Sequence, residues 1–109
     1  MAYSAKQSPE PLHMRPVPDR PWQYVGTDIL TFRGHEYLIT EDYFSQFFEL
    51  DYLPDTTAET VINKMKQHFA RHGTPDVVIS DNGTQYSSAE FARFAREWSF
   101  IHETSSPGH

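Results

Sequence analysis

The sequence predicts an α/β fold in which a mixed sheet is built in the order β-β-β-α-β-α-β. Segments with alternating apolar residues fill the first half of the chain, and two segments with apolar residues at helical spacing follow. A short, continuous apolar run separates the two helical segments, as expected for a central strand. At 109 residues the chain has room for one hydrophobic core.

Three strands are predicted in the first half of the chain. Residues 22–32 alternate between two faces, one of which carries Gly26 and Asp28. A turn follows, and residues 35–40 and 46–52 are predicted to form the second and third strands. The short connections between these segments favour an antiparallel meander.

Two helices are predicted from capping signals and apolar periodicity. Each begins with a Ser/Thr-x-x-Glu capping box, at Thr56 to Glu59 and at Ser87 to Glu90. Gly73 sits where the C-cap of the first helix belongs. The predicted apolar faces are Ala58, Val61, Ile62, Met65 and Phe69 in the first helix and Phe91, Phe94, Ala95 and Trp98 in the second.

The remaining segments complete the predicted domain. Residues 77–80 form the continuous apolar run, so we expect a strand that is covered on both faces. Residues 99–102 are expected to form a last short strand, and the polar residues 104–109 a loop. Residues 1–21 hold five of the eight prolines and predict an extended linker, which leaves residues 22–109 as the folded domain.

Composition excludes several classes of protein. The net charge of −6 argues against strong DNA binding by this chain alone. The absence of cysteine excludes disulfides and thiolate metal sites. No apolar run is long enough for a transmembrane helix, so no membrane partner is expected. The N-terminus also lacks the apolar segment of a signal peptide, and we therefore expect a nuclear or cytoplasmic protein that is not secreted.

Two aspartates in apolar surroundings indicate a metal site. Asp28 lies inside the first predicted strand, and Asp81 follows the strand at residues 77–80. A carboxylate in a buried strand is costly unless it is paired or holds a metal. Carboxylate and water oxygens are the ligands that Mg²⁺ prefers. On spacing alone a plainer interpretation stays open, in which Asp28 is a strand-edge residue and Asp81 forms the turn at Asp-Asn-Gly.

Four short segments in a fixed order carry a family resemblance. They are residues 22–28 (WQYVGTD), 42–45 (DYFS), 72–75 (HGTP) and 80–85 (SDNGTQ). Together they resemble the catalytic core of retroviral and gypsy-class retrotransposon integrases, which are DDE polynucleotidyl transferases. The resemblance runs from about Pro11 to His109 and implies a ribonuclease H-like fold, in which the first and fourth strands are neighbours.

The resemblance implies an activity and a set of residues. The activity is metal-dependent DNA 3′-end processing and strand transfer, with Asp28 and Asp81 as catalytic residues that share one Mg²⁺ or Mn²⁺. Asn82 and Gln85 match the family and are expected to bind DNA or to orient the aspartate. The family also has a third carboxylate on a later helix, and 28 residues follow Asp81. The resemblance therefore implies a core truncated before that carboxylate and lacking the family's C-terminal helices, with Glu103 as the nearest substitute.

Other candidate residues favour plainer interpretations. His68 and His72 have the spacing of a helical metal-binding pair, but the segment does not give His-Glu-x-x-His and no third ligand is evident, which favours a solvated helix face. The aromatic residues Trp22, Tyr37, Phe47 and Trp98 are interpreted as core residues, and not as a platform on which bases stack.

Two functions from different classes remain at this point. In the first, the chain is a fragment of an integrase core that binds DNA weakly. In the second, it is a non-catalytic remnant that acts as a dimerisation or interaction module, with a second copy or a full-length integrase as its partner.

Overall fold

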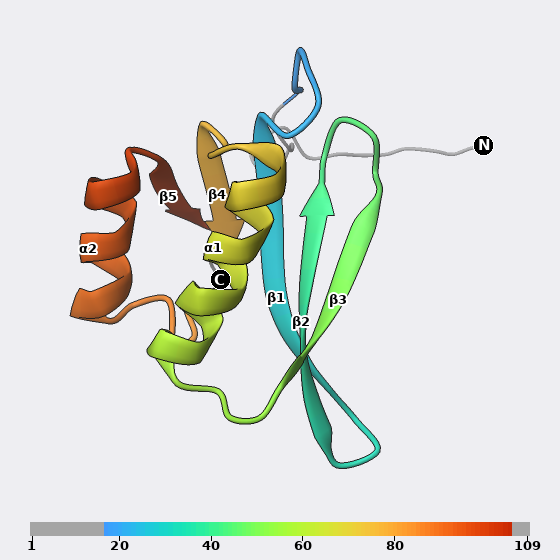
Figure 1. Cartoon of the computed structure of the whole chain (residues 1–109), viewed down its shortest axis with the longest axis vertical. Coiled ribbons are helices and arrows are strands. Elements are labelled where there is room, and N and C mark those ends of the chain that lie inside the picture. Colours follow the sequence, from blue (N-terminus) through green and yellow to red (C-terminus); the bar gives the residue numbers. More distant parts are fainter. Residues whose placement is uncertain (1–16, 106–109) are drawn as a thin grey trace.

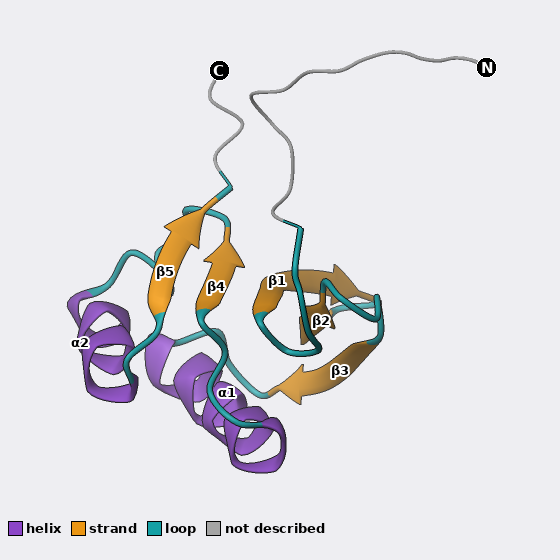
Figure 2. Ribbon diagram, turned by 90° about the horizontal axis from the view of Figure 1, so that it is seen from above, coloured by secondary structure: helices purple, strands orange, loops and turns teal. Residues whose placement is uncertain are grey.

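Two helices cover one face of a five-stranded sheet in the computed structural model, which describes residues 17–105 (Figure 1). Figure 2 shows both helices on the same side of the strands. The elements confirm the predicted order and the α/β class. They are β1 (Tyr24–Phe32), β2 (His35–Asp42), β3 (Phe48–Leu53), α1 (Ala58–His72), β4 (Val77–Ser80), α2 (Ala89–Trp98) and β5 (Ile101–Thr104).

The sheet is mixed, with the spatial order β3-β2-β1-β4-β5. β1, β2 and β3 form the predicted antiparallel meander. β4 pairs parallel to β1, and β5 pairs parallel to β4. Parallel neighbours need a crossover connection, and α1 and α2 provide the two crossovers. The first and fourth strands are therefore neighbours, as the resemblance implied.

The core lies between the helices and the sheet. All five residues of the predicted apolar face of α1 are buried. In α2, Phe91 and Phe94 are buried, whereas Ala95 and Trp98 are partly buried against the same cluster. Aromatic rings dominate the contact, with centroids 5.6 Å apart for Phe91 and Phe94. All four residues of β4 are buried, which confirms a strand covered on both faces.

Both helices begin one residue later than predicted. The N-cap of α1 is Thr57, whose hydroxyl accepts the Thr60 N–H at 3.2 Å. The N-cap of α2 is Ser88, whose hydroxyl accepts the Phe91 N–H at 3.1 Å. The glutamates of the two predicted capping boxes are therefore not at the N3 position. The predicted C-cap is confirmed, since Gly73 has φ 93° and donates its N–H to the Phe69 carbonyl.

The ends of the chain differ in part from the prediction. Of the predicted linker, residues 17–21 are described, and they form neither helix nor strand. β5 begins two residues later than expected because Ser99 ends α2 in a left-handed conformation, with φ 61°. Thr104 belongs to that strand. Residues 106–109 of the predicted loop lie outside the described residues.

Two predictions about single side chains were wrong. His68 is 1% exposed and faces the sheet, because β3 turns Asp51 and Glu49 toward α1 and both carboxylates contact its ring. Its spacing from Val61 and Met65 continues the buried face of the helix. Phe47 is 66% exposed, because it lies in the β2–β3 turn outside the core.

Candidate active site

The pairing of β1 with β4 positions the two predicted aspartates. Gly26 pairs with Ile79, and the same register carried two residues further brings Asp28 beside Asp81. Because side chains alternate along a strand, both carboxylates point to the same face of the sheet. They line one pocket of ≈190 Å³. The other lining residues are Gly26, Thr27, Ile39, Glu41, Tyr43, Ile79 and Ser105.

Each aspartate is held by a neighbouring backbone group. Asp28 Oδ1 accepts the Ile29 N–H at 2.8 Å, and Asp81 Oδ1 accepts the Gly83 N–H at 2.8 Å. Among the described residues, the second oxygen of each carboxylate makes no hydrogen bond. Both side chains are exposed to solvent, so burial itself does not demand a metal here. The convergence of two anionic groups on one pocket is what favours a cation.

A buried hydrogen bond supports the pocket from below. Thr27 Oγ1 and Tyr86 Oη lie 3.1 Å apart, and the bond joins β1 to the segment after β4. Burial raises the pKa of Tyr86 far above its usual value, and the charges of Asp81 and Asp28 act in the same direction. The phenol therefore stays protonated. This bond fixes the middle of β1, which carries Asp28, relative to the segment after β4, which carries Asp81.

The turn after β4 brings the Gln85 and Asp81 side chains close to Gly83. A Cβ on Gly83 would come within 2.7 Å of Gln85 Oε1 and 3.1 Å of Asp81 Oδ1. The Gln85 amide can therefore lie across the turn beside Asp81. Neither Asn82 nor Gln85 is among the residues that line the pocket. Their contact with DNA stays a prediction.

The end of β2 and the residue after it form the opposite wall of the pocket. A Cβ on Gly26 would come within 2.8 Å of the Tyr43 ring, so the glycine allows that ring to lie against β1. Glu41 adds a third carboxylate to the lining. Sequence reasoning missed Glu41, Tyr43 and Tyr86. The pairing of Glu41 with Gly26 places it there, and a local pattern does not show that pairing.

The donor set suits a hard divalent cation. Carboxylate oxygens favour Mg²⁺ or Mn²⁺ over softer metals. Within residues 17–105, no group of three or more His, Cys, Asp or Glu side chains is arranged to hold a metal. Glu41 and Glu103 therefore do not complete a three-ligand site in this part of the chain. Asp28 and Asp81 are the two residues that would hold an ion, with water as its remaining ligands.

A mixed sheet of this order, with Asp28 in β1 beside Asp81 just after β4, is the ribonuclease H-like fold. The chain belongs to the integrase core domain family, whose model matches residues 17–109. The "Uncharacterized protein K02A2.6" of Caenorhabditis elegans is 33% identical over 96 residues, which are 87% of this chain and 8% of that protein.

Solved integrase structures share the fold. A simian T-cell lymphotropic virus intasome, in complex with PP2A regulatory subunit B56 gamma, matches with a TM-score of 0.75 at 23% identity, over 87% of this chain and 37% of that chain. The BIV integrase catalytic core domain matches with a TM-score of 0.73 at 18% identity, over 81% of this chain and 57% of that chain. The HTLV-2 integrase catalytic core domain in complex with magnesium matches with a TM-score of 0.67 at 23% identity, over 77% of this chain and 60% of that chain.

The chain covers only part of the length of the relatives that it matches. It spans less than two thirds of each of these relatives. Neither of the described helices is long and apolar enough to cross a membrane.

Proposed function

We propose that this chain is part of a catalytic core that processes DNA 3′ ends and joins them to target DNA, with Asp28 and Asp81 holding Mg²⁺ or Mn²⁺. One observation carries the proposal: the two carboxylates come from adjacent parallel strands and line one pocket. Membership of the integrase core domain family supports the class of chemistry. The HTLV-2 relative was solved in complex with magnesium, which supports the choice of ion. We also propose a nuclear or cytoplasmic location for this activity.

The residues of the chain have distinct parts in this proposal. A divalent ion held by Asp28 and Asp81 would supply activation of the nucleophile and stabilisation of the leaving oxygen in a phosphoryl transfer. Asp28 and Asp81 would hold the ion, and the Thr27–Tyr86 hydrogen bond joins β1 to the segment after β4, the two parts of the chain that present them. Asn82 and Gln85 are the proposed DNA contacts beside the pocket. The net charge of −6 gives little attraction for DNA, so the chain alone binds it weakly.

Metal binding tests the site directly. Mn²⁺ is titrated into the chain, and the fraction of free ion is followed by electron paramagnetic resonance. We expect Asp28→Asn and Asp81→Asn each to weaken binding at least about tenfold, because each removes one of two anionic ligands. Glu97→Gln is the matched control, since it removes an equal charge from an exposed residue of α2 that does not line the pocket. If all three variants bind Mn²⁺ equally, the ion is not held by the two aspartates.

A second candidate function is an interaction module, and a surface favours it. The residues of β3 that alternate with Glu49 and Asp51 point away from α1, and each is more than half exposed. They are Phe48, Leu50 and Tyr52. Exposed apolar patches of this kind mark interfaces. The proposed partner is a second copy of the chain or a full-length integrase.

Sedimentation separates the two candidates. We expect Leu50→Glu to shift a self-associating chain toward the monomer without changing its Mn²⁺ affinity. Association that persists without any metal-dependent activity would favour the interaction module. A chain that is monomeric at every concentration would contradict self-association through this surface.

A further inference from the structure

A second pocket opens on the other face of the sheet from the two aspartates. It measures ≈340 Å³ and shares no lining residue with the active-site pocket. We call it the aromatic pocket. It lies where the start of β1, the β2–β3 turn and the end of α1 meet. Its lining includes Trp22, Thr40, Asp42, Phe47, Glu49 and His72.

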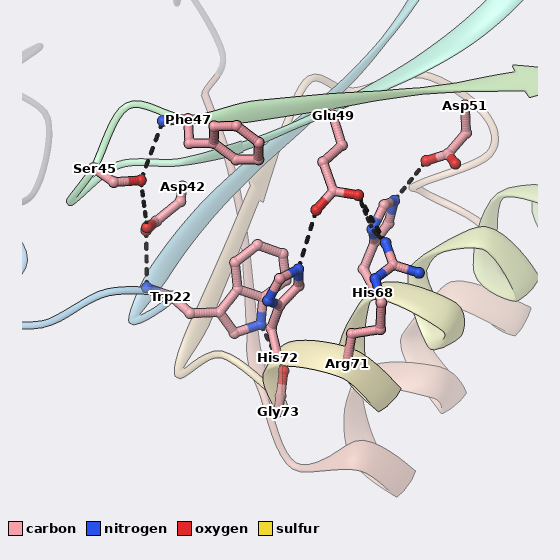
Figure 3. A network of polar contacts seen from close by, with 10 residues as sticks. All are labelled: Trp22, Asp42, Ser45, Phe47, Glu49, Asp51, His68, Arg71, His72 and Gly73. Atoms are coloured by element: carbon pink, nitrogen blue, oxygen red, sulfur yellow. Dashed lines mark hydrogen bonds and ion pairs between the residues drawn. The ribbon is translucent and has the colours of Figure 1, made fainter.

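Two aromatic residues form its walls, and hydrogen bonds fix the side chain of Trp22 and the backbone of Phe47. The Trp22 indole donates its Nε1–H to the Gly73 carbonyl at 2.5 Å, and its ring lies 4.5 Å from that of His72. The backbone of Phe47 is fixed by two hydrogen bonds, to Ser45 Oγ and from the Asp42 N–H. Figure 3 shows the Phe47 ring and the Trp22 indole facing the space beside the Glu49 carboxylate. The core therefore does not explain the position of Phe47.

The surroundings of the pocket carry an excess of carboxylates. Asp42 and Glu49 line it, and Asp51 joins the same polar network through His68 at 2.5 Å. Arg71 is the one guanidinium in the network that Figure 3 draws, 2.7 Å from Glu49. Burial raises the pKa of Glu49, but the hydrogen bond from His72 and the charges of His68 and Arg71 hold it below its usual value. Glu49 therefore stays ionised.

One buried hydroxyl in the lining has no partner. Thr40 is 2% exposed, and its Oγ1 makes no hydrogen bond among the described residues. A buried polar atom without a partner is costly and rare in native proteins. A hydrogen-bond donor that enters the pocket would satisfy it. This observation is independent of the aromatic walls and of the carboxylates, and it points to a ligand.

We propose that the aromatic pocket binds the charged side chain of a lysine or arginine from a polypeptide partner. Aromatic faces attract organic cations through their ring quadrupoles, and the carboxylates add ionic attraction. The cation also donates hydrogen bonds, and Thr40 Oγ1 is a buried acceptor without a donor among the described residues. A phosphate or a nucleic-acid backbone is disfavoured, because Asp42 and Glu49 repel it. Nothing in this inference depends on the metal site, so either can fail without the other.

Capped amino acids test the charge requirement. The ¹⁵N-labelled chain is titrated with Nα-acetyl-lysine methylamide, with the arginine analogue, and with the neutral Nα-acetyl-norleucine methylamide. The Trp22 Nε1–H resonance reports on binding. We expect saturable shifts with either charged compound and several-fold weaker binding of norleucine. Norleucine binding as tightly as lysine, or no saturable shift with either cation, would overturn the proposal.

Phe47→Ala tests the aromatic wall without disturbing the core, since the side chain is mostly exposed. We expect lysine to bind about two- to fivefold more weakly, the effect of one partly exposed cation–π contact. Phe32→Ala is the matched control, an exposed phenylalanine that does not line the pocket. A melting curve confirms that both variants are folded. Equal lysine affinity in the Phe47 and Phe32 variants would rule out the aromatic wall and with it the proposed site.

Discussion

At the scale of single residues, Asp42 shows how a segment of the family resemblance works in the fold. Its carboxylate accepts the Trp22 N–H at 2.9 Å, the Phe44 N–H at 3.1 Å and the Ser45 hydroxyl at 2.9 Å. The side chain is 7% exposed. The bonds tie the start of β1 to the β2–β3 turn. The Asp-Tyr-Phe-Ser segment is therefore explained by a turn that this aspartate organises.

We expect Asp42→Asn to lower the free energy of unfolding by about 1.5–3 kcal/mol, because it removes hydrogen bonds to a buried charge. Burial raises the pKa of Asp42, but these bonds bring it below its usual value. A depressed folded-state pKa stabilises the protein above the unfolded-state value of about 3.9, and this stabilisation is lost as the pH falls through the folded-state value. Urea unfolding at about pH 7 and about pH 2 should show the gap between the two proteins shrinking. A gap that does not change with pH would show that the ionised carboxylate is not the stabilising group.

At the scale of elements, the helix starts show what local sequence leaves undecided. Two adjacent hydroxyl residues precede each helix, and either satisfies the capping pattern. In α1 the choice falls on Thr57 because Asp55 accepts both its N–H and its hydroxyl. The prediction therefore found the helices and their buried faces but placed each cap one residue early.

Ser88→Ala should cost about 0.5–2 kcal/mol, because the Phe91 N–H at the start of α2 then loses its acceptor. Ser87→Ala is the matched control, since the exposed Ser87 does not cap the helix. The two losses are compared by chemical denaturation. A larger loss for Ser87→Ala would restore the predicted capping box.

The packing of α2 makes a stronger prediction. Phe91 is fully buried, and its ring centroid lies 5.4 Å from that of Tyr86 and 4.7 Å from that of His102. Phe91→Ala should therefore lower the free energy of unfolding by about 3–5 kcal/mol. Trp98→Ala should cost less, because Trp98 is only partly buried. Equal losses for the two variants, measured in urea, would mean that the ends of α2 contribute alike to the core.

At the scale of the whole molecule, the predictable part of the site is the part that strand order determines. The apolar runs around the two aspartates predict their strands. The family resemblance implies that these strands are neighbours, and this arrangement brings Asp28 and Asp81 together. Glu41, Tyr43 and Tyr86 reach the same pocket through pairing and packing between distant segments. The sequence does not predict the aromatic pocket either, because it also depends on packing between distant segments. Its walls come from Trp22, Phe47 and the end of α1, and each of these has a plainer interpretation in isolation.

The last prediction concerns the reaction itself. We expect this chain to bind one divalent ion without efficient strand transfer. Asp28 and Asp81 provide two carboxylates, and the described residues offer no arranged group of three ligands. Positioning two ions in phosphoryl transfer needs more ligands than these. The chain is compared with a version lengthened past His109 to bring in the third carboxylate that the family resemblance implies, each with Mn²⁺ and a short DNA duplex. Lengthening should raise joining, and Asp81→Asn should abolish the gain. Equal activity in the two proteins would mean that a residue within this chain completes the site, with Glu41 and Glu103 as the residues to replace first.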